Sequence, residues 1–160
     1  MGIAATARAA NDWVVLGLIN AGVSAGTAGA VWLFGFKSQK AQVNCTYGFA
    51  GFGLGLGIGL LPVDAAQPQN GDRIYGRRDF SAGDLDGADG TVINEGWDIY
   101  GWSFGKLLIS ASDARSAPYF SFQLVPGPNS GLGIDASCVR GRWKLLSLRD
   151  TKTGQFWNAF

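Results

Sequence analysis

From residue 30 onward the chain consists largely of strand-length runs, and between 43 and 60 large side chains alternate with polar residues or glycine, a period of two that predicts β-strands. Turn-forming residues separate strand-length runs at 30–37, 40–59, 97–113, 119–127, 131–150 and 154–160. Ser38-Gln39 stands between the first two runs and predicts a two-residue turn, so that 30–60 forms a glycine-rich hairpin. The sequence therefore predicts one mainly β domain over 1–160, an antiparallel barrel or sandwich, with C-terminal strands over 97–160.

The N-terminal segment departs from this pattern. Residues 3–20 are rich in alanine, and apolar residues at helical spacing predict a short helical segment within 1–22. The second half of this segment, WVVLGLIN, fits a short buried strand equally well. Arg8 ahead of an apolar run imitates a signal peptide, but Asp12 abuts that run, so we expect the segment to belong to the fold. The compartment stays open, with membrane association and non-classical secretion both compatible with the sequence.

A run of alternating glycines follows in the second strand. Apolar side chains occupy odd positions up to Phe49 and even positions from Phe52 to Leu60. This change of phase at Ala50-Gly51 predicts a β-bulge. A strand face without side chains permits the close approach of a backbone, a ring or a ligand. We therefore expect something large to lie against this face, and we expect the apolar residues beside it to contact a ligand: Phe52, Leu54 and Leu56.

Residues 62–96 form the least regular and most acidic stretch, with Asp and Gly clusters that are typical of turns. Within it, DLDGADGTVINE resembles a twelve-residue calcium loop with one residue inserted. An ordinary solvated turn is the favoured interpretation, so no cofactor is expected, and the alternative that the resemblance implies is a bound Ca²⁺. The implied oxygen ligands are Asp84, Asp86, Asp89 and Glu95.

Aromatic residues follow these carboxylates at Trp97, Tyr100 and Trp102. Carbohydrate sites use this mixture because aromatic faces stack on sugar rings while carboxylates accept hydrogen bonds from sugar hydroxyls. One hypothesis is therefore a carbohydrate-dependent or calcium-dependent binding module centred on 84–102. Paired carboxylates also hydrolyse glycosides, but aspartates in glycine-rich turns are more often turn formers.

The segment CVRGRWK predicts a basic stripe on one face of a strand, formed by Arg140, Arg142 and Lys144. Such a stripe binds phosphate, an anionic lipid surface or an acidic partner, unless it is simply a solvated face. Since RNA-binding aromatic motifs and phosphate-cradling loops are absent from the sequence, nucleic acid is not an expected partner.

The chain contains no histidine, which removes the commonest general base and metal ligand as well as the Ser–His and Cys–His pairs of hydrolases. We therefore expect a protein without enzymatic activity. Cys45 and Cys138 form either one disulfide or two thiols. The thiols are favoured because a core of this size needs no covalent cross-link.

Two uncharged segments, 13–36 and 47–62, allow an alternative in which the protein inserts into membranes or forms pores. The first is long enough to cross a bilayer as a helix, and glycines four residues apart let such helices pack closely. Polar residues dilute the first segment, however, and the strict alternation in the second favours a strand.

Apolar residues make up 47% of the chain and charged residues only 16%, about two thirds of the usual share. This surplus favours a non-enzymatic binding or assembly protein that buries an apolar ligand or a partner surface. The expected partners are an apolar small molecule, a lipid or a protein, including a second copy of the chain.

Overall fold

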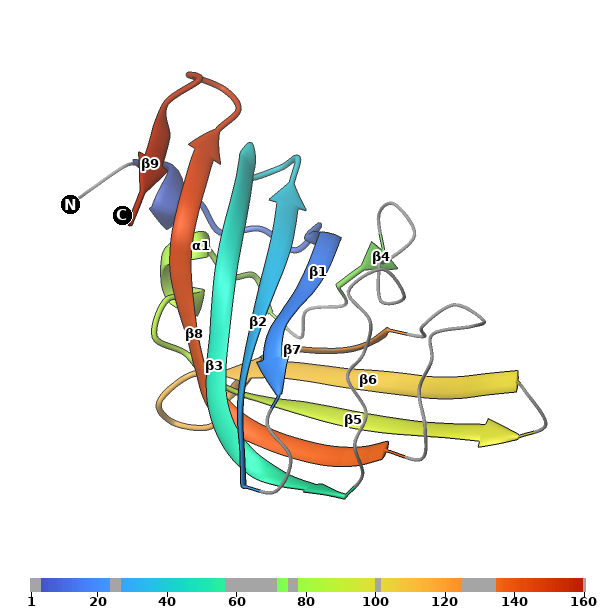
Figure 1. Cartoon of the computed structure of the whole chain (residues 1–160). Coiled ribbons are helices and arrows are strands. Elements are labelled where there is room, and N and C mark those ends of the chain that lie inside the picture. Colours follow the sequence, from blue (N-terminus) through green and yellow to red (C-terminus); the bar gives the residue numbers. More distant parts are fainter. Residues whose placement is uncertain are drawn as a thin grey trace.

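The described strands form one curled antiparallel sheet, a half-barrel with the strand order β4-β1-β2-β3-β8-β5-β6-β7 (Figure 1). The computed structural model describes residues 4–23, 27–56, 72–74, 78–99, 102–124 and 135–159, with side chains for 4–16, 33–53, 74, 78–93, 108–121 and 138–159. The strands are β1 (Val14–Val23), β2 (Thr27–Ser38), β3 (Val43–Leu56), β4 (Asp72–Arg73), β5 (Asp89–Ile99), β6 (Trp102–Ser112), β7 (Pro118–Leu124), β8 (Asp135–Asp150) and β9 (Phe156–Asn158), which pairs with β8. The predicted class, mainly β and antiparallel, is confirmed.

The predicted N-terminal helix is limited to one 3-10 turn, η1 (Ala4–Ala7), and the alternative of a strand holds for the second half of that segment. β1 pairs with β2 along its length. Trp13, directly before β1, is 1% exposed, and its indole N–H donates to the carbonyls of Ala10 and Phe80, each at 3.1 Å. Strand pairing and burial of this ring outweigh the helix propensity of alanine, which is only a weak preference.

Residues 39–42 form the turn between β2 and β3, in place of the predicted two-residue turn at Ser38-Gln39. Asp12 determines this geometry from outside the hairpin. Its carboxylate accepts hydrogen bonds from the backbone N–H groups of Gln39 and Lys40, at 3.0 and 2.9 Å, and from the Ser38 hydroxyl. A longer turn is therefore stable because a side chain from the N-terminal segment satisfies its backbone donors.

Part of the segment predicted to be irregular, 62–96, belongs to the sheet, since β5 begins at Asp89 and pairs with both β6 and β8. One helical turn, α1 (Ala82–Leu85), precedes it. Ser81 caps this turn, because its hydroxyl accepts from the Asp84 N–H at 3.2 Å and the Asp84 carboxylate accepts from the Ser81 N–H at 2.9 Å. The run predicted at 97–113 is divided between the end of β5 and β6.

β3 keeps one phase through the described residues, so the β-bulge predicted at Ala50-Gly51 is wrong. The register between β2 and β3 is continuous across this point. Odd-numbered residues face the interior on both sides of it: Phe49 is fully buried and Gly51 is buried, whereas Phe52 is 82% exposed. The shift in register lies on the partner strand β8, where Leu146 is the extra residue. The glycines of β3 therefore continue the inward face.

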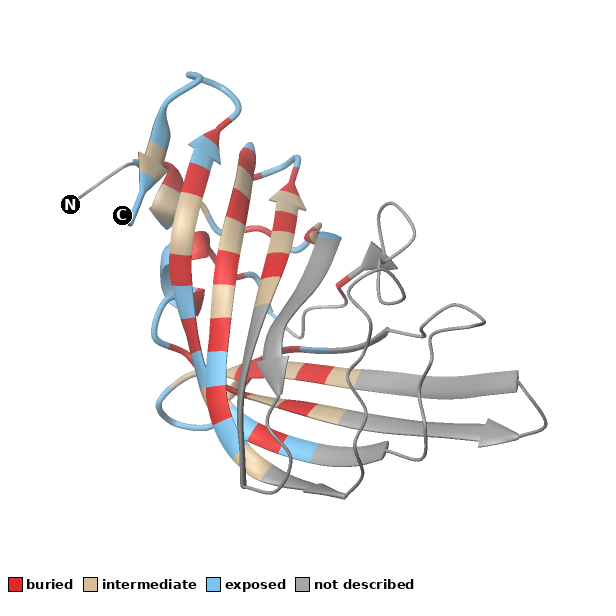
Figure 2. Cartoon of the chain, in the orientation of Figure 1, coloured by how far each residue is buried: buried red, intermediate tan, exposed pale blue. Residues whose placement is uncertain are grey.

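Aromatic rings fill the interior of the half-barrel around Trp143, and buried residues alternate with less buried ones along β2, β3 and β8 (Figure 2). The Trp143 ring centroid lies 4.9–6.2 Å from five other ring centroids, those of Phe34, Phe36, Tyr47, Phe49 and Phe120. Its indole N–H donates to the carbonyl of Ser110 at 3.2 Å. Trp143 is therefore the centre of the described core.

Both cysteines are free thiols, as the sequence favoured, although only Cys45 is buried. Burial raises the pKa of the Cys45 thiol to about 12, so this group stays protonated at neutral pH and is a poor nucleophile. The described parts of 13–36 and 47–62 are strands in β1, β2 and β3. Among the described residues, no helix has the length and apolar character needed to span a membrane.

Candidate functional site

Three glycines on neighbouring strands of the sheet lie side by side. Gly51 of β3 pairs with Gly141 of β8, and Gly141 pairs on its other side with Gly90 of β5. We call these residues the glycine row. The row lies next to the inward-facing pair of Phe49 and Trp143.

A side chain at any position of the glycine row would overlap its neighbours. A Cβ atom on Gly51 would lie 2.4 Å from the carbonyl oxygen of Arg140, and one on Gly141 would lie 2.1 Å from that of Ala50. A Cβ on Gly90 would lie 2.3 Å from the indole nitrogen of Trp143. At these positions the bare face predicted from the sequence admits backbone and a core ring.

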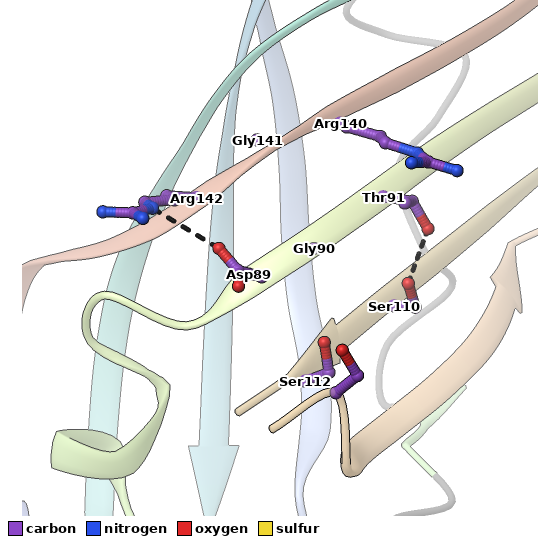
Figure 3. A pocket seen from close by; sticks show the side chains of 9 residues that line it. Asp89, Gly90, Thr91, Ser110, Ser112, Arg140, Gly141 and Arg142 are labelled. Atoms are coloured by element: carbon purple, nitrogen blue, oxygen red, sulfur yellow. Dashed lines mark hydrogen bonds and ion pairs between the residues drawn. The ribbon is translucent and has the colours of Figure 1, made fainter. Parts of the chain in front are cut away.

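The residues on either side of the glycine row point outward and form two polar rows across β8, β5 and β6. The first row is Arg140, Thr91 and Ser110, and the second is Arg142, Asp89 and Ser112. Together with Ser116 of the β6–β7 loop, these side chains line a recess of about 530 Å³ (Figure 3). The recess lies on the opposite side of the sheet from Trp143. Its position follows from the register of three segments, 50–52, 89–91 and 140–142, which pair at their central glycines.

The charges of the recess are unevenly paired. The Arg142 Nε atom lies 3.4 Å from Asp89 Oδ1, and both side chains are mainly exposed, so this ion pair is weak and open to exchange with a ligand. Arg140 is exposed and has no hydrogen bond or ion pair with the described residues. Two guanidinium groups beside one carboxylate leave the recess with a net positive charge.

Hydroxyl groups form the rest of the polar lining. The Thr91 and Ser110 hydroxyls point toward one another and lie 2.6 Å apart, as the dashed line in Figure 3 marks. One proton joins these two groups, which leaves one donor and several lone pairs for a ligand. The hydroxyls of Ser112 and Ser116 have no hydrogen-bond partner among the described residues. The recess therefore offers free donors and acceptors.

The loop that carries Ser116 is held in place by Asp113. Its carboxylate accepts from the backbone N–H groups of Arg115 and Ala117, both at 2.9 Å, and from the Arg78 guanidinium at 2.8 Å. The hydrogen bond from Arg78, foremost among several, lowers the pKa of this carboxyl. Ser116 itself has a φ of 61°, and the surrounding hydrogen bonds hold this left-handed conformation. This wall of the recess is therefore formed before any ligand binds.

The three predicted cations lie on one exposed face of β8, and Arg140 and Arg142 line the recess while Lys144 does not. The Lys144 ammonium lies 3.7 Å from Asp86 Oδ1 instead. Asp86 also accepts from the backbone N–H of Leu145 at 2.9 Å, which attaches the loop before β5 to β8.

The predicted calcium ligands have separate contacts in the described structure. Asp84 accepts from the backbone N–H of Ser81 in the capping box of α1, Asp86 accepts from the β8 backbone, and Asp89 pairs with Arg142. The side chain of Glu95 lies outside the described residues. Within the described ranges, no three His, Cys, Asp or Glu side chains gather into a group that would hold a metal ion.

Of the predicted apolar contacts, Phe52 points to the outer face rather than the interior. The side chains of the others lie outside the described residues: Leu54, Leu56, Trp97, Tyr100 and Trp102. Sequence reasoning missed the four hydroxyl residues of the recess, because Ser and Thr carry no distinctive pattern. The usable signal is the set of x-Gly-x triplets, since AGF, DGT and RGR meet in register at their glycines.

A second recess of about 240 Å³ lies on the outer face of β2, β3, β8 and β9. Two partly exposed apolar residues border it, Leu16 at 45% and Phe156 at 60% exposure. Asn44 also lines it, and the buried Oδ1 atom of this residue has no hydrogen-bond partner in the described structure. Because it holds fewer charged and hydroxyl groups, this recess is the weaker candidate.

Comparisons of the chain with protein-family models, with curated proteins and with solved structures gave no match. The chemistry of the larger recess therefore rests on its own residues. This lining is chemically suited to an anionic, hydroxyl-rich ligand. The Arg140 guanidinium has no partner among the described residues and that of Arg142 is loosely paired, so both could make charge-assisted hydrogen bonds, and the hydroxyl groups could add neutral ones.

Proposed function

We propose that this protein is a non-enzymatic binding protein, and that its ligand site is the recess beside the glycine row, where Arg140 binds an anionic group. The observation that carries the proposal is the Arg140 guanidinium, which has no partner among the described residues, in a recess of about 530 Å³ lined with hydroxyl groups. An arginine places two parallel N–H donors against a carboxylate or phosphate, so one free guanidinium suffices to orient such a group.

The outer face is a better candidate than the interior for the described part of the sheet. The apolar-ligand hypothesis requires room among inward-facing side chains. Around Trp143 these positions hold rings that are at most 1% exposed, including Phe34, Phe49 and Phe120. At the glycine row, backbone takes the place of side chains. Binding of a lipid, of an apolar molecule or of a membrane through 13–36 and 47–62 stays a prediction.

The residues of the recess favour binding over a chemical reaction. Its serines have no imidazole beside them, because the chain contains no histidine. The thiol of Cys45 lies on the buried side of β3 and stays protonated. Asp89, the carboxylate of the recess, already faces Arg142. The arrangement is thus suited to holding a ligand.

Titration of ¹⁵N-labelled protein with inorganic sulfate at constant ionic strength tests this proposal. We expect saturable amide shifts at residues 89–91, 110–116 and 140–142, and at least tenfold weaker binding by Arg140→Gln. Lys144→Gln is the matched control, because it removes one positive charge from the same strand face outside the recess. Equal binding by the two variants, or shifts spread over the whole surface, would contradict an Arg140 site.

A further inference from the structure

An exposed aromatic residue extends the first polar row. Phe52 of β3 is directly opposite Arg140 of β8, so that one line across four strands reads Phe52, Arg140, Thr91 and Ser110. Phe52 is 82% exposed, the largest exposure among the large apolar residues of the described part. This solvated ring adds no burial to the fold, and it lies beside the Arg140 guanidinium, where a bound ligand could contact both groups.

The row combines three kinds of contact in a fixed order. The ring of Phe52 offers a flat apolar face, Arg140 offers paired cationic donors, and the hydroxyls of Thr91 and Ser110 offer one donor with several acceptors. With neighbouring strands about 4.8 Å apart, the row is about 14 Å long. This length accommodates a flat, extended ligand of a few rings rather than a single small ion.

The carboxylate of Asp89 discriminates between classes of anion. It lies in the second row beside the first, 3.4 Å from Arg142, and accepts hydrogen bonds without donating any. A phosphate group carries up to two negative charges, so this carboxylate weakens its binding more than that of a group with one negative charge. A sugar unit with one carboxylate and several hydroxyls instead matches both groups, since its hydroxyls donate to Asp89 while its carboxylate binds Arg140.

We infer that the recess takes an acidic saccharide, that is, an oligosaccharide of sugar acids whose ring stacks on Phe52 and whose carboxylate binds Arg140. This inference rests on the proposed function and specifies its ligand class. The sugar hydroxyls bind Thr91, Ser110 and Asp89, while Ser112 and Ser116 bind the neighbouring unit. The binding surface thus lies across β3, β8, β5 and β6, and is distinct from the predicted aromatic set at 97–102.

Isothermal titration with a galacturonic acid trisaccharide tests the inference, with the neutral galactose trisaccharide, inorganic sulfate and a short single-stranded oligonucleotide as comparison probes. We expect the acidic trisaccharide to bind at least tenfold more tightly than the neutral one or sulfate. Phe52→Ala should weaken trisaccharide binding about five- to tenfold, the usual contribution of an aromatic contact, and leave sulfate binding unchanged. Phe156→Ala is the matched control, because it removes an exposed ring from the other recess.

The outcomes separate the two proposals. Sulfate binding that depends on Arg140, combined with trisaccharide binding that is unaffected by Phe52→Ala, would overturn the saccharide inference and leave the proposed function standing. Loss of every Arg140-dependent signal would overturn both. Tighter binding of the oligonucleotide than of the trisaccharide, again dependent on Phe52, would overturn the inference in favour of single-stranded nucleic acid.

Discussion

Two neighbouring cross-strand pairs of β3 and β8 face the interior and fill it in opposite ways. Phe49 and Trp143 fill it with two buried rings, and Trp143 contacts rings from several strands. Gly51 and Gly141 fill it with backbone, since a Cβ on Gly141 would lie 2.1 Å from the carbonyl oxygen of Ala50. The interior is therefore closely packed at both pairs, by two large rings at Phe49 and Trp143 and by backbone alone at Gly51 and Gly141.

The outward faces of these two regions differ as well. Outside the glycine row lie the charged and hydroxyl groups of the larger recess. Because side chains alternate between the two faces of a strand, the residues that flank Gly141 and Gly90 point outward, and the register aligns them in two rows. The glycines thus allow close packing on the inward side of the sheet, while the residues beside them form the candidate site on the outward side.

The largest effect is expected in the region filled with rings. Trp143→Ala removes the central ring of the core and the hydrogen bond to the Ser110 carbonyl. We expect the free energy of unfolding to fall by about 3–5 kcal/mol, as for other buried tryptophans, measured by urea denaturation. Phe156→Ala, on the exposed strand β9, is the control and should change it by about 0.5 kcal/mol or less. Equal losses would contradict the central role of Trp143.

The next largest effect is expected for Gly90→Ala, because Gly90 belongs to the glycine row and lies against the Trp143 ring. The new Cβ would lie 2.3 Å from the Trp143 indole nitrogen and 2.6 Å from the Ser110 carbonyl oxygen, so the indole must move and its hydrogen bond must break. We expect a loss of about 1–3 kcal/mol and a shift of the Trp143 indole proton in the NMR spectrum. An unchanged indole signal would show that the glycine row does not support the core.

A smaller, pH-dependent effect on the free energy of unfolding is expected at the ion pair between the N-terminal segment and the end of β8. Arg8 donates to both carboxylate oxygens of Asp150, at 3.1 and 2.8 Å, and Asp150 is 2% exposed. The hydrogen bond from Arg8, as the largest cause, holds the pKa of Asp150 well below its usual value. Its ordinary value in an unfolded chain is about 3.9.

Because the folded pKa is lowered, this contribution to stability is complete well above about pH 4 and is lost as the pH falls through the folded value. We expect the urea midpoint of the protein to fall between pH 5 and pH 2, and to fall less steeply in Arg8→Gln. Parallel pH profiles of the two proteins would contradict the assignment.

The smallest effect on stability is expected in the recess. Arg140 is exposed and without a partner in the described structure, so Arg140→Gln should change the free energy of unfolding by about 0.5 kcal/mol or less. Urea denaturation checks this directly. A loss above about 1 kcal/mol would show that Arg140 supports the fold, and it would weaken the case for a ligand site.

The sequence predicts the class of this fold well because alternation marks strands wherever inward positions carry apolar side chains. It fails at Ala50-Gly51 for a physical reason. The inward positions there are glycines, so the large apolar residue, Phe52, points outward. The pattern of apolar residues therefore changes phase although the register of the strand does not. It fails at 3–20 because an alanine-rich stripe fits a helix while Asp12 and Trp13 bind to distant parts of the sheet.

The site is less predictable than the fold. The sequence places Arg140 and Arg142 on one face, since alternation within one strand requires no knowledge of its neighbours. It does not show that Thr91, Ser110 and Ser112 lie beside them, because cross-strand register joins residues up to about fifty positions apart. Matching the glycines of neighbouring strands would have aligned Asp89 with Arg142.

The most direct test of the account compares two glycine substitutions on β3. A Cβ on Gly51 would lie 2.4 Å from a β8 backbone oxygen, whereas one on Gly48 would lie 3.2 Å from the flexible end of Leu146. We measure the free energy of unfolding of Gly51→Ala and Gly48→Ala under identical conditions. The account predicts a loss of about 1–3 kcal/mol for Gly51→Ala and a change of about 0.5 kcal/mol or less for Gly48→Ala. Equal stability of the two variants would contradict the claim that the missing side chain at Gly51 lets the β8 backbone approach β3 closely.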